Sequence, residues 1–478
     1  MKRYESLAYE FSDAIRTGIW RAGDRLPSVR SLARERGVSP TTVFSTYYLL
    51  ESWGLVRAQD RSGYYVVGHP VVRPPEFDGA KADVAGHVVQ PKVIDRVFDV
   101  LSAMLRRDVV PLGTAFPSAH LFPLERLGQL VGKAARNVDP WSTVDNLSMG
   151  DLRLRRNIAR RYAATGKAVH ADEVIITNGA MEALNLCLMS VARPGDAVAV
   201  ESPAFYGVFQ ALERLGLRAI EIPTHPEQGM DLQVLEQVLA EQRPAACWVM
   251  SHFQNPLGSL MPEEKKQALA EMAARHRIPV IEDDVYGELH FSNEALRPIK
   301  SYDRDGWVLH CSSFSKTLAP HYRVGWAIPG RFIDRMARQK LTFSLAASMP
   351  AQVALAAYLE QGSYDKQLRL LRRTLQSTQG EMLHAIAGSF PAETRCTRPE
   401  GGYFLWLELP QDVDAMTLFR LALEQGVSLA PGPMFTARDG AYGNCVRLNY
   451  GLEWNDSVAR AVQWLGRNLK APAPRQAA

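Results

Sequence analysis

Residues 312–326, SSFSKTLAPHYRVGW, place one lysine among hydroxyl side chains and a cation seven residues after it. The lysine is Lys316, the hydroxyls belong to Ser313 and Ser315, and the cation is Arg323. A lysine acts as a nucleophile only when it is close to deprotonation, which a partly buried place beside other cations favours. Hydroxyls and a guanidinium also bind phosphate. The stretch therefore predicts a reactive lysine beside a phosphate site, although such a lysine in isolation is more often part of a solvated loop.

An acidic run closes an apolar strand upstream of this lysine. The run IPVIEDD covers residues 278–284, and Asp283 comes at the carboxyl end of the expected strand. Open α/β sheets place their ligand chemistry at that edge. Asp283 could pair with a ring nitrogen, and Tyr286, three residues later, could donate to a ring oxygen. If the run is only an acidic loop, Glu282 or Asp284 could serve equally well.

A strand-to-helix turn could bind the phosphate. The run TNGAMEALNL, residues 177–186, follows an apolar strand and opens a helix. Helix N-termini attract anions because their first N–H groups have no partner within the helix. We expect the backbone N–H groups of Gly179, Ala180 and Met181 to hold the phosphate, although many strand-to-helix turns look alike.

Three later side chains could contact a flat ring and a ligand. Phe205 in ESPAFYG follows a proline turn and is suited to stack on a ring, or else it is core packing. Asn255 in FQNPLG can donate to a ring oxygen, or else it is a turn residue. Arg447 in VRLNYG presents a fork for a carboxylate, or else it forms a surface ion pair.

Together these motifs match the needs of pyridoxal 5′-phosphate (PLP). This cofactor requires a lysine for an imine, a carboxylate for its pyridine nitrogen, donors for its phosphate and ring oxygen, and a flat residue against the ring. From about residue 91 to 470 the chain resembles the fold-type I PLP enzymes of the aspartate aminotransferase group. The matching motifs are G-x3-LR at Gly150, Leu154 and Arg155, then N-G-A, P-A-F, N-P-L-G, D-x-x-Y, S-x-S-K and R-L-N-Y. The resemblance implies a large domain with a mostly parallel sheet, a smaller α+β domain and a site at a subunit interface.

Three positions depart from the pattern of that group. The tyrosine usual a few residues before Gly150 has no counterpart in VDNLSM, residues 144–149. In the group, this tyrosine reaches the phosphate of the partner subunit's cofactor. Met181 stands where a polar residue is frequent, and Phe205 replaces a tyrosine or tryptophan. We expect PLP binding to survive these changes more readily than efficient transamination.

The alternation of elements agrees with that fold. After residue 91, amphipathic helices alternate with short apolar strands at 173–177, 197–201, 246–250, 278–282, 307–311 and 324–328. Such alternation predicts an α/β fold, a mostly parallel sheet with helices on both faces. The last helix is expected at about 455–469. Residues 69–90 are interpreted as a linker and residues 471–478 as a disordered tail.

Residues 1–68 are expected to form a separate winged helix-turn-helix. Helices are predicted at about 3–17, 28–36 and 40–53, the third with Ser39 as N-cap and Pro40 at its first position. The run GLVRAQDRSGYYVV then predicts a small hairpin. Residues placed to contact DNA are Arg30, Ser39, Thr41, Thr42, Arg57, Arg61, Ser62 and Gly63. The alternative is a small helical domain with ordinary surface arginines.

A second resemblance favours DNA binding. Residues 18–66, with GDRLPS-x-R, GVS-x-TTV and SGYYV, closely resemble the DNA-binding domain of GntR-type bacterial regulators. In that family the residues matching Arg30, Thr41, Thr42 and Gly63 contact DNA. Pro40 departs from the basic residue often found at its position.

Composition excludes several other classes of protein. The chain has 478 residues, enough for two or three domains, and a formal net charge of only +4. Its five cysteines are scattered, so neither a disulfide framework nor a metal site is predicted. The N-terminus lacks the apolar core of a signal peptide, and no stretch approaches the roughly 18 apolar residues of a membrane span. We expect a soluble cytoplasmic protein that does not bind membranes.

A GntR-type head joined to a fold-type I body resembles the MocR subfamily of bacterial regulators. The resemblance implies a head-to-tail homodimer that binds a double-stranded DNA operator. It also implies that the body senses an amino compound, or the vitamin B6 level, through imine exchange at Lys316. Two alternatives remain: an active aminotransferase with an appended DNA-binding domain, and a regulator in which PLP is only a structural element.

Overall fold

The computed structural model describes residues 2–59, 62–67, 72–75, 88–104, 106–137, 139–292 and 294–469. By their packing, residues 1–73, 373–394 and 452–478 form one compact unit, and residues 74–372 and 395–451 form the other. Most of the predicted linker (69–71 and 76–87) and the whole predicted tail lie outside the described residues.

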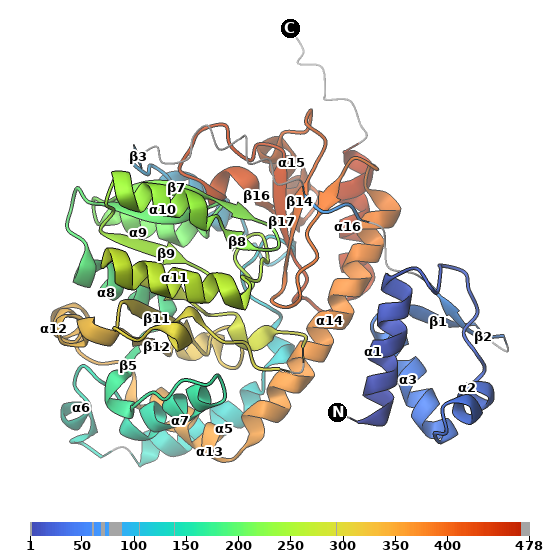
Figure 1. Cartoon of the computed structure of the whole chain (residues 1–478), viewed down its shortest axis with the longest axis horizontal. Helices are drawn as coiled ribbons and strands as arrows, with labels where there is room; N and C mark the ends of the chain where they lie inside the picture. The colour runs from blue at the N-terminus through green and yellow to red at the C-terminus, as the bar shows by residue number, and fades with distance from the viewer. Residues whose placement is uncertain are drawn as a thin grey trace, which may run out of the picture. The chain divides into compact units, whose positions relative to one another are not determined.

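The N-terminal part of the first unit is a winged helix-turn-helix (Figure 1). Its elements are α1 (Arg3–Arg16), α2 (Val29–Glu35), α3 (Pro40–Ser52), β1 (Val56–Gln59) and β2 (Gly63–Val66). The two strands pair as an antiparallel hairpin. The Ser39 hydroxyl accepts a hydrogen bond from the Thr42 N–H at 3.1 Å, which is the predicted cap of the third helix. Val43, Tyr47 and Leu50 of α3 are fully buried in a core shared with α1 and α2.

The second unit is built on a nine-stranded sheet. Its order is β3-β7-β6-β9-β10-β11-β12-β5, with β8 paired to β7. Strands β7, β6, β9, β10 and β11 run parallel, whereas β12, β5, β3 and β8 pair antiparallel with their neighbours. The bounds are β3 (Val88–Val89), β5 (Ile175–Thr177), β6 (Ala197–Ser202), β7 (Arg218–His225), β8 (Gly229–Met230), β9 (Ala246–Val249), β10 (Val280–Asp283), β11 (Val308–Ser313) and β12 (Gly325–Ile328). The predicted α/β class with a mainly parallel sheet is confirmed.

Helices cover both faces of this sheet (Figure 1). Val308 of β11 packs in a cluster with residues of α10 (Leu232–Glu241) and α11 (Glu263–His276). Cys311, three residues later, faces α8 (Ala180–Val191), where its sulfur lies 3.5 Å from that of Cys187. Because successive side chains of a strand point to opposite faces, α8 and α11 lie on opposite sides of the sheet.

A second cluster joins β5 and β12 to α5 (Leu124–Arg136), α7 (Leu152–Ala163) and α13 (Met349–Glu360). Further helices are α4 (Ile94–Met104), α6 (Ser142–Asp145), α9 (Tyr206–Arg214), α12 (Ile333–Phe343), α14 (Ser363–Ser389), α15 (Ala415–Glu424) and α16 (Asp456–Asn468). None of the described helices combines the length and the apolar character that a membrane crossing requires.

A smaller antiparallel sheet completes the second unit. It consists of β13 (Arg395–Cys396), β14 (Phe404–Glu408), β17 (Cys445–Asn449) and β16 (Ala430–Pro431). Strands β4 (Val110–Pro111) and β15 (Val427–Ser428) form a short parallel pair, and Gly113 follows β4 two residues later. Strand β17 carries Arg447, so the two sheets supply different parts of one site.

Candidate functional site

Successive side chains of β10 point to opposite faces of the sheet, and this decides which of three acidic residues faces the candidate site. Val280 packs on the α11 side of the sheet. Glu282 therefore points to the α11 side and Asp283 to the α8 side, because side chains two apart share a face. Asp283 is 2% exposed, and its buried Oδ1 atom has no hydrogen-bond partner within the described residues.

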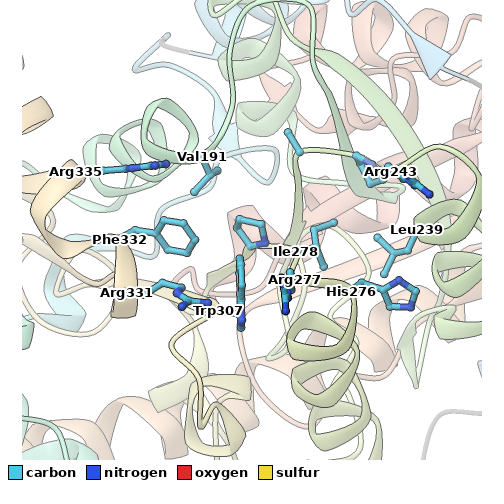
Figure 2. Close-up of a pocket in the computed structure, with 13 residues that line it drawn as sticks. Val191, Leu239, Arg243, His276, Arg277, Ile278, Trp307, Arg331, Phe332 and Arg335 are labelled. Atoms are coloured by element: carbon cyan, nitrogen blue, oxygen red, sulfur yellow. The ribbon is translucent and has the colours of Figure 1, made fainter.

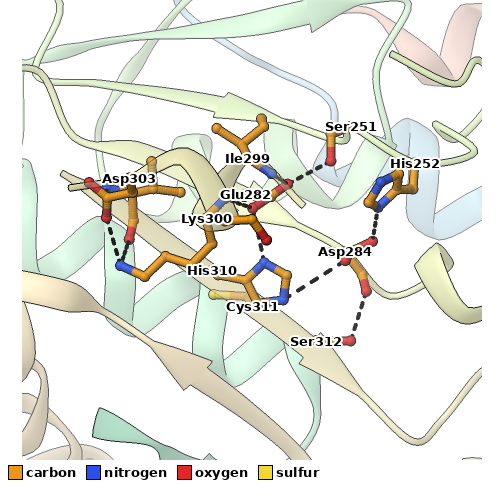
Figure 3. A network of polar contacts seen from close by, with 12 residues as sticks. Ser251, His252, Glu282, Asp284, Ile299, Lys300, Asp303, His310, Cys311 and Ser312 are labelled. Atoms are coloured by element: carbon orange, nitrogen blue, oxygen red, sulfur yellow. Dashed lines mark hydrogen bonds and ion pairs between the residues drawn. The ribbon is translucent and has the colours of Figure 1, made fainter. Parts of the chain in front are cut away.

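Glu282 and Asp284, the neighbours of Asp283 in the chain, form hydrogen bonds with other residues (Figure 3). Glu282 accepts hydrogen bonds from the Ser251 hydroxyl at 2.6 Å and from the N–H groups of Ile299 and Lys300 at 2.7 and 3.0 Å. Its other contact is the ring of His310, at 3.0 Å. Burial raises the pKa of Glu282, but the hydrogen bond and charge of His310 bring it below its usual value.

Asp284 is held in the same way. Its Oδ1 lies 2.8 Å from Nδ1 of His252, and its backbone carbonyl accepts a hydrogen bond from the Ser312 hydroxyl at 2.7 Å. Of the three carboxylates, the predicted Asp283 is the one that keeps an unused buried oxygen among the described residues, whereas Glu282 and Asp284 of the acidic-loop alternative are engaged elsewhere.

Lys316 lies in the turn after β11, close to cations. Its Nζ atom donates to the Ala115 carbonyl at 2.6 Å and sits 4.1 Å from the centre of the Phe116 ring. Loss of hydration and the positive charges of Arg447 and Arg323 lower the pKa of Lys316 to about 7, while Asp283 opposes that shift. A fraction of Lys316 is therefore neutral, and so nucleophilic, near neutral pH.

The predicted phosphate residues meet at the start of α8. Arg323 donates to the Ser315 hydroxyl at 3.2 Å, and the Ser313 hydroxyl accepts from the Ser315 N–H at 3.3 Å. A Cβ on Gly179 would lie 2.4 Å from the terminal nitrogen Nη2 of Arg323. Gly179 thus lets a guanidinium approach the helix N-terminus, where the N–H groups of Ala180 and Met181 begin α8. This arrangement is suited to a phosphate.

Asn255 and Arg447 form a buried hydrogen-bonded pair. Each is 1% exposed. Arg447 donates to Oδ1 of Asn255 at 2.9 Å and to the Gly113 carbonyl at 2.6 Å. Its guanidinium carbon lies 4.1 Å from the centre of the Phe404 ring. The alternative of a surface ion pair for Arg447 is excluded by this burial.

Two aromatic residues frame the remaining side. Tyr286 is 2% exposed and packs edge-on against Tyr403, with ring centres 5.5 Å apart. Phe205 is half-buried and precedes α9, where its ring lies over Gly207 and 4.7 Å from that of Tyr206. The ring centre of Phe435 lies 6.1 Å from that of Tyr206 and 5.2 Å from the guanidinium carbon of Arg447, which links Phe205 to the other residues.

Three buried polar atoms at this site have no partner among the described residues: Nδ2 of Asn255, Oδ1 of Asp283 and Nε of Arg447. They are a donor, an acceptor and a second donor. Buried polar groups are almost always hydrogen-bonded, so three such atoms around one lysine indicate a missing ligand. PLP offers a ring oxygen to Asn255 and a protonated ring nitrogen to Asp283, and its phosphate suits the Arg323 cluster. The residues present therefore fit the cofactor.

Several residues near the site were not predicted from the sequence. Ala115 and Phe116 contact Lys316 but belong to a loop without a recognisable motif. A Cβ on Gly325 would lie 2.6 Å from the backbone of Gly179, so this glycine allows β12 to approach the phosphate turn. The only sequence signal for this role was the position of Gly325 two residues after Arg323, in the run RVG.

Seven of the eight predicted DNA-contacting residues are described, and Arg61 lies outside the described residues. Arg30, Thr41 and Arg57 are exposed on α2, α3 and β1. The hydroxyls of Ser39 and Thr42 lie 2.8 Å apart at the start of α3. The Ser62 hydroxyl lies 2.6 Å from that of Tyr65. Gly63 at the hairpin tip has φ +113°.

The helix-turn-helix presents additional side chains. Phe44 and Tyr48 lie four residues apart on α3 and are 55% and 66% exposed. Arg25 covers the hairpin tip, because a Cβ on Gly63 would lie 3.4 Å from its Nε atom. Their i, i+4 spacing puts the two aromatic side chains on one face of the helix, and this spacing could have revealed the pair.

The fold and the site together define a helix-turn-helix protein with an aminotransferase-like body. The family model described as "Aminotransferase class I and II" matches residues 147–462, and that described as "Bacterial regulatory proteins, gntR family" matches residues 3–66. These matches cover the candidate PLP site and the helix-turn-helix respectively.

Two relatives match this chain over nearly its whole length. The protein named uncharacterized HTH-type transcriptional regulator YdcR, from Escherichia coli K12, is 42% identical over 98% of this chain and 99% of its own length. YjiR from the same organism, with the same descriptive name, is 37% identical over 98% of both chains. The crystal structure of LysN, an alpha-aminoadipate aminotransferase from Thermus thermophilus complexed with N-(5′-phosphopyridoxyl)-L-leucine, matches with a TM-score of 0.71. It is 31% identical and covers 78% of this chain and 94% of LysN.

The chain belongs to the GntR-type regulators that carry a class I and II aminotransferase domain, the architecture of the MocR subfamily. The predicted resemblance is thereby confirmed.

Proposed function

We propose that this protein is a transcription regulator that binds an operator through its winged helix-turn-helix and binds PLP at Lys316. Its body senses an amino compound or the vitamin B6 level. One observation carries the proposal. The same chain combines a GntR-type head with a site that contains a lysine of lowered pKa and three buried polar atoms without hydrogen-bond partners among the described residues.

Each side chain has a role in this proposal. PLP, when bound, supplies an aldehyde that can exchange between Lys316 and a free amine. Lys316 competes with the incoming amine because it is partly deprotonated near pH 7. Asp283 favours the protonated ring nitrogen, and Arg323 with the start of α8 anchors the phosphate. Arg447 binds the carboxylate of an amino-acid ligand through its free Nε.

A homodimer forms part of the proposal. Exposed apolar side chains occur on and beside α6 and α12: Trp141, Val144, Leu341, Phe343 and Leu345. The two segments adjoin, since the Leu345 carbonyl accepts a hydrogen bond from the Ser148 N–H at 3.2 Å. Such a patch is typical of an interface between subunits. Light scattering should report a dimer that Trp141→Asp weakens and Leu421→Asp, an exposed leucine outside the patch, does not.

The decisive experiment titrates PLP and amines against two readouts in parallel: the visible absorbance, and affinity for a duplex selected from random DNA by the full chain. Lys316→Ala should abolish the borohydride-reducible adduct and the effect of amines on DNA affinity. Lys366→Ala, which removes an exposed lysine of the same unit, should change neither. An adduct of normal yield in Lys316→Ala would refute the lysine assignment.

The same experiment separates the alternatives. Conversion of an amino acid and a keto acid at ordinary enzyme rates would favour an active aminotransferase. The 31% sequence identity to the aminotransferase LysN is compatible with this alternative. PLP binding without any effect of PLP or amines on DNA affinity would favour a structural role. A change in DNA affinity on amine addition would favour the regulator, because a ligand shifts a conformational equilibrium only through different affinities for its two states.

A further inference from the structure

A hollow of about 650 Å³ opens at the edge of the main sheet opposite the PLP site. Residues 244–245, 278–279 and 307 line it, and they directly precede β9, β10 and β11. Asp283 lies at the other end of β10. Because these strands are parallel, the hollow lies at their amino ends and the PLP site at their carboxyl ends.

The hollow is rich in cations. Arg331 and Arg335 stand on one side of it, with Arg243 on the other and Arg277 between them (Figure 2). All four side chains are exposed. No Asp or Glu belongs to the lining, and within the described part of the chain none of the four guanidinium groups has an ion-pair partner.

One acidic side chain that contacts the lining is already engaged. The carboxylate of Glu236 lies 2.6 Å from Nε2 of His276, a residue that lines the hollow. It also lies 2.6 Å from Nη2 of Arg275. Like charges gathered without counter-charges repel each other and create a positive potential, which an anion relieves. A concave site focuses that potential more strongly than a flat surface does.

The walls between the arginines are apolar and partly aromatic. Trp307 is half-buried, packs edge-on against Phe332 with ring centres 5.9 Å apart, and carries Arg331 at 4.3 Å from its ring centre. Leu239 and Ile278 add aliphatic surface. The volume falls in the range of small-ligand sites, roughly 300–1,000 Å³, so the hollow is too large for a lone inorganic anion.

We propose that this hollow binds a small phosphate ester with a flat apolar group, such as a nucleotide, through Arg243, Arg277, Arg331 and Arg335. The phosphates take the arginines, whose forked donors match phosphate oxygens. The flat group packs on the wall formed by Trp307, Phe332 and Ile278. The site is separate from the PLP site and gives the body a second ligand.

Calorimetry with the full-length, PLP-loaded protein tests this site, because PLP then fills the other phosphate position. The probes are ATP, pyrophosphate and adenosine, without magnesium. We expect ATP to bind most tightly, pyrophosphate more weakly and adenosine least. Reversing two cations in Arg331→Glu/Arg335→Glu should lower ATP affinity by about tenfold or more. Arg338→Glu, which changes an exposed residue on the same helix as Arg335 but outside the lining, should change ATP affinity by less than about twofold.

A second variant protects the test against misfolding. Arg243→Glu alters an exposed residue on the far side of the hollow and should also weaken ATP binding, while the PLP absorbance stays unchanged. Absence of ATP and pyrophosphate binding to the wild type would overturn the proposal. So would an equal loss in Arg338→Glu, or adenosine binding as tightly as ATP. If the double variant weakens only duplex DNA binding, the arginines contact DNA and the small-ligand site is wrong.

Discussion

Asp283→Asn should make the PLP-free protein more stable and at the same time weaken PLP binding. Asp283 is 2% exposed, and one of its carboxylate oxygens has no hydrogen-bond partner in the part of the chain that the structure describes. Burial and the neighbouring Asp284 raise its pKa from 3.8 to about 7. Ionised Asp283 therefore destabilises the PLP-free fold, because its charge is buried. An amide of the same shape has no charge and does not destabilise the fold in this way.

The size of the effect follows from proton linkage. The pKa of Asp283 is higher in the folded than in the unfolded chain, so its contribution to stability falls as pH rises from about 4 to about 7. One pKa unit corresponds to about 1.4 kcal/mol. The difference in free energy of unfolding between the variant and the wild type should increase by about 3 kcal/mol, in favour of the variant, when the pH rises from about 5 to about 8. Loss of a hydrogen bond to a charged group, about 1.5–3 kcal/mol, should weaken PLP binding by about 10- to 150-fold.

Denaturant unfolding of the PLP-free proteins at several pH values measures the first effect, and titration of the visible absorbance measures the second. Asp284→Asn is the matched control, because it removes a carboxylate that lies 2.8 Å from His252 and should lower stability instead. The reasoning is refuted if the advantage of Asp283→Asn does not grow with pH, or if its PLP affinity stays within about twofold of the wild type.

Three further predictions concern single side chains. Arg30→Ala should weaken DNA binding and reduce the dependence of log affinity on log salt by about one unit, with an unchanged PLP spectrum, as measured by fluorescence anisotropy. Gly179→Ala should displace Arg323, whose Nη2 would lie 2.4 Å from the new Cβ, and absorbance titration should report PLP affinity lowered by about tenfold. Ser39→Ala removes the cap of α3 and should destabilise the helix-turn-helix by about 1 kcal/mol, visible as increased amide hydrogen exchange in residues 40–52.

Local signals in the sequence predicted most of the elements. The Ser39–Pro40 pair marks a helix start because serine caps the first N–H groups and proline needs no donor there, and α3 begins at Pro40. The expected strand at 278–282 corresponds to β10 at Val280–Asp283, and the expected final helix at 455–469 to α16 at Asp456–Asn468. Apolar runs bounded by turn residues predict strands to within two residues.

Features that depend on long-range packing were not predictable in this way. The acidic run by itself could not choose among Glu282, Asp283 and Asp284, and only the resemblance through D-x-x-Y pointed to Asp283. A choice on physical grounds requires knowing which side chains of β10 face α11. The contact of Lys316 with Phe116 joins residues 200 positions apart in the chain. The arginine-lined hollow likewise combines single residues from several connections, none of which forms a motif.

The two faces of β10 explain how an incompletely hydrogen-bonded site can persist in a stable fold. On the α11 side, Glu282 is fully engaged with Ser251, His310 and two backbone N–H groups, and this fixes the strand. On the α8 side, Asp283 keeps an unpaired oxygen. A sensor needs such atoms, because a ligand changes a conformational equilibrium only where it gains contacts that the protein alone does not make. A site in which Asp283 was already paired would hold its shape equally well, but a ligand would gain little by binding there.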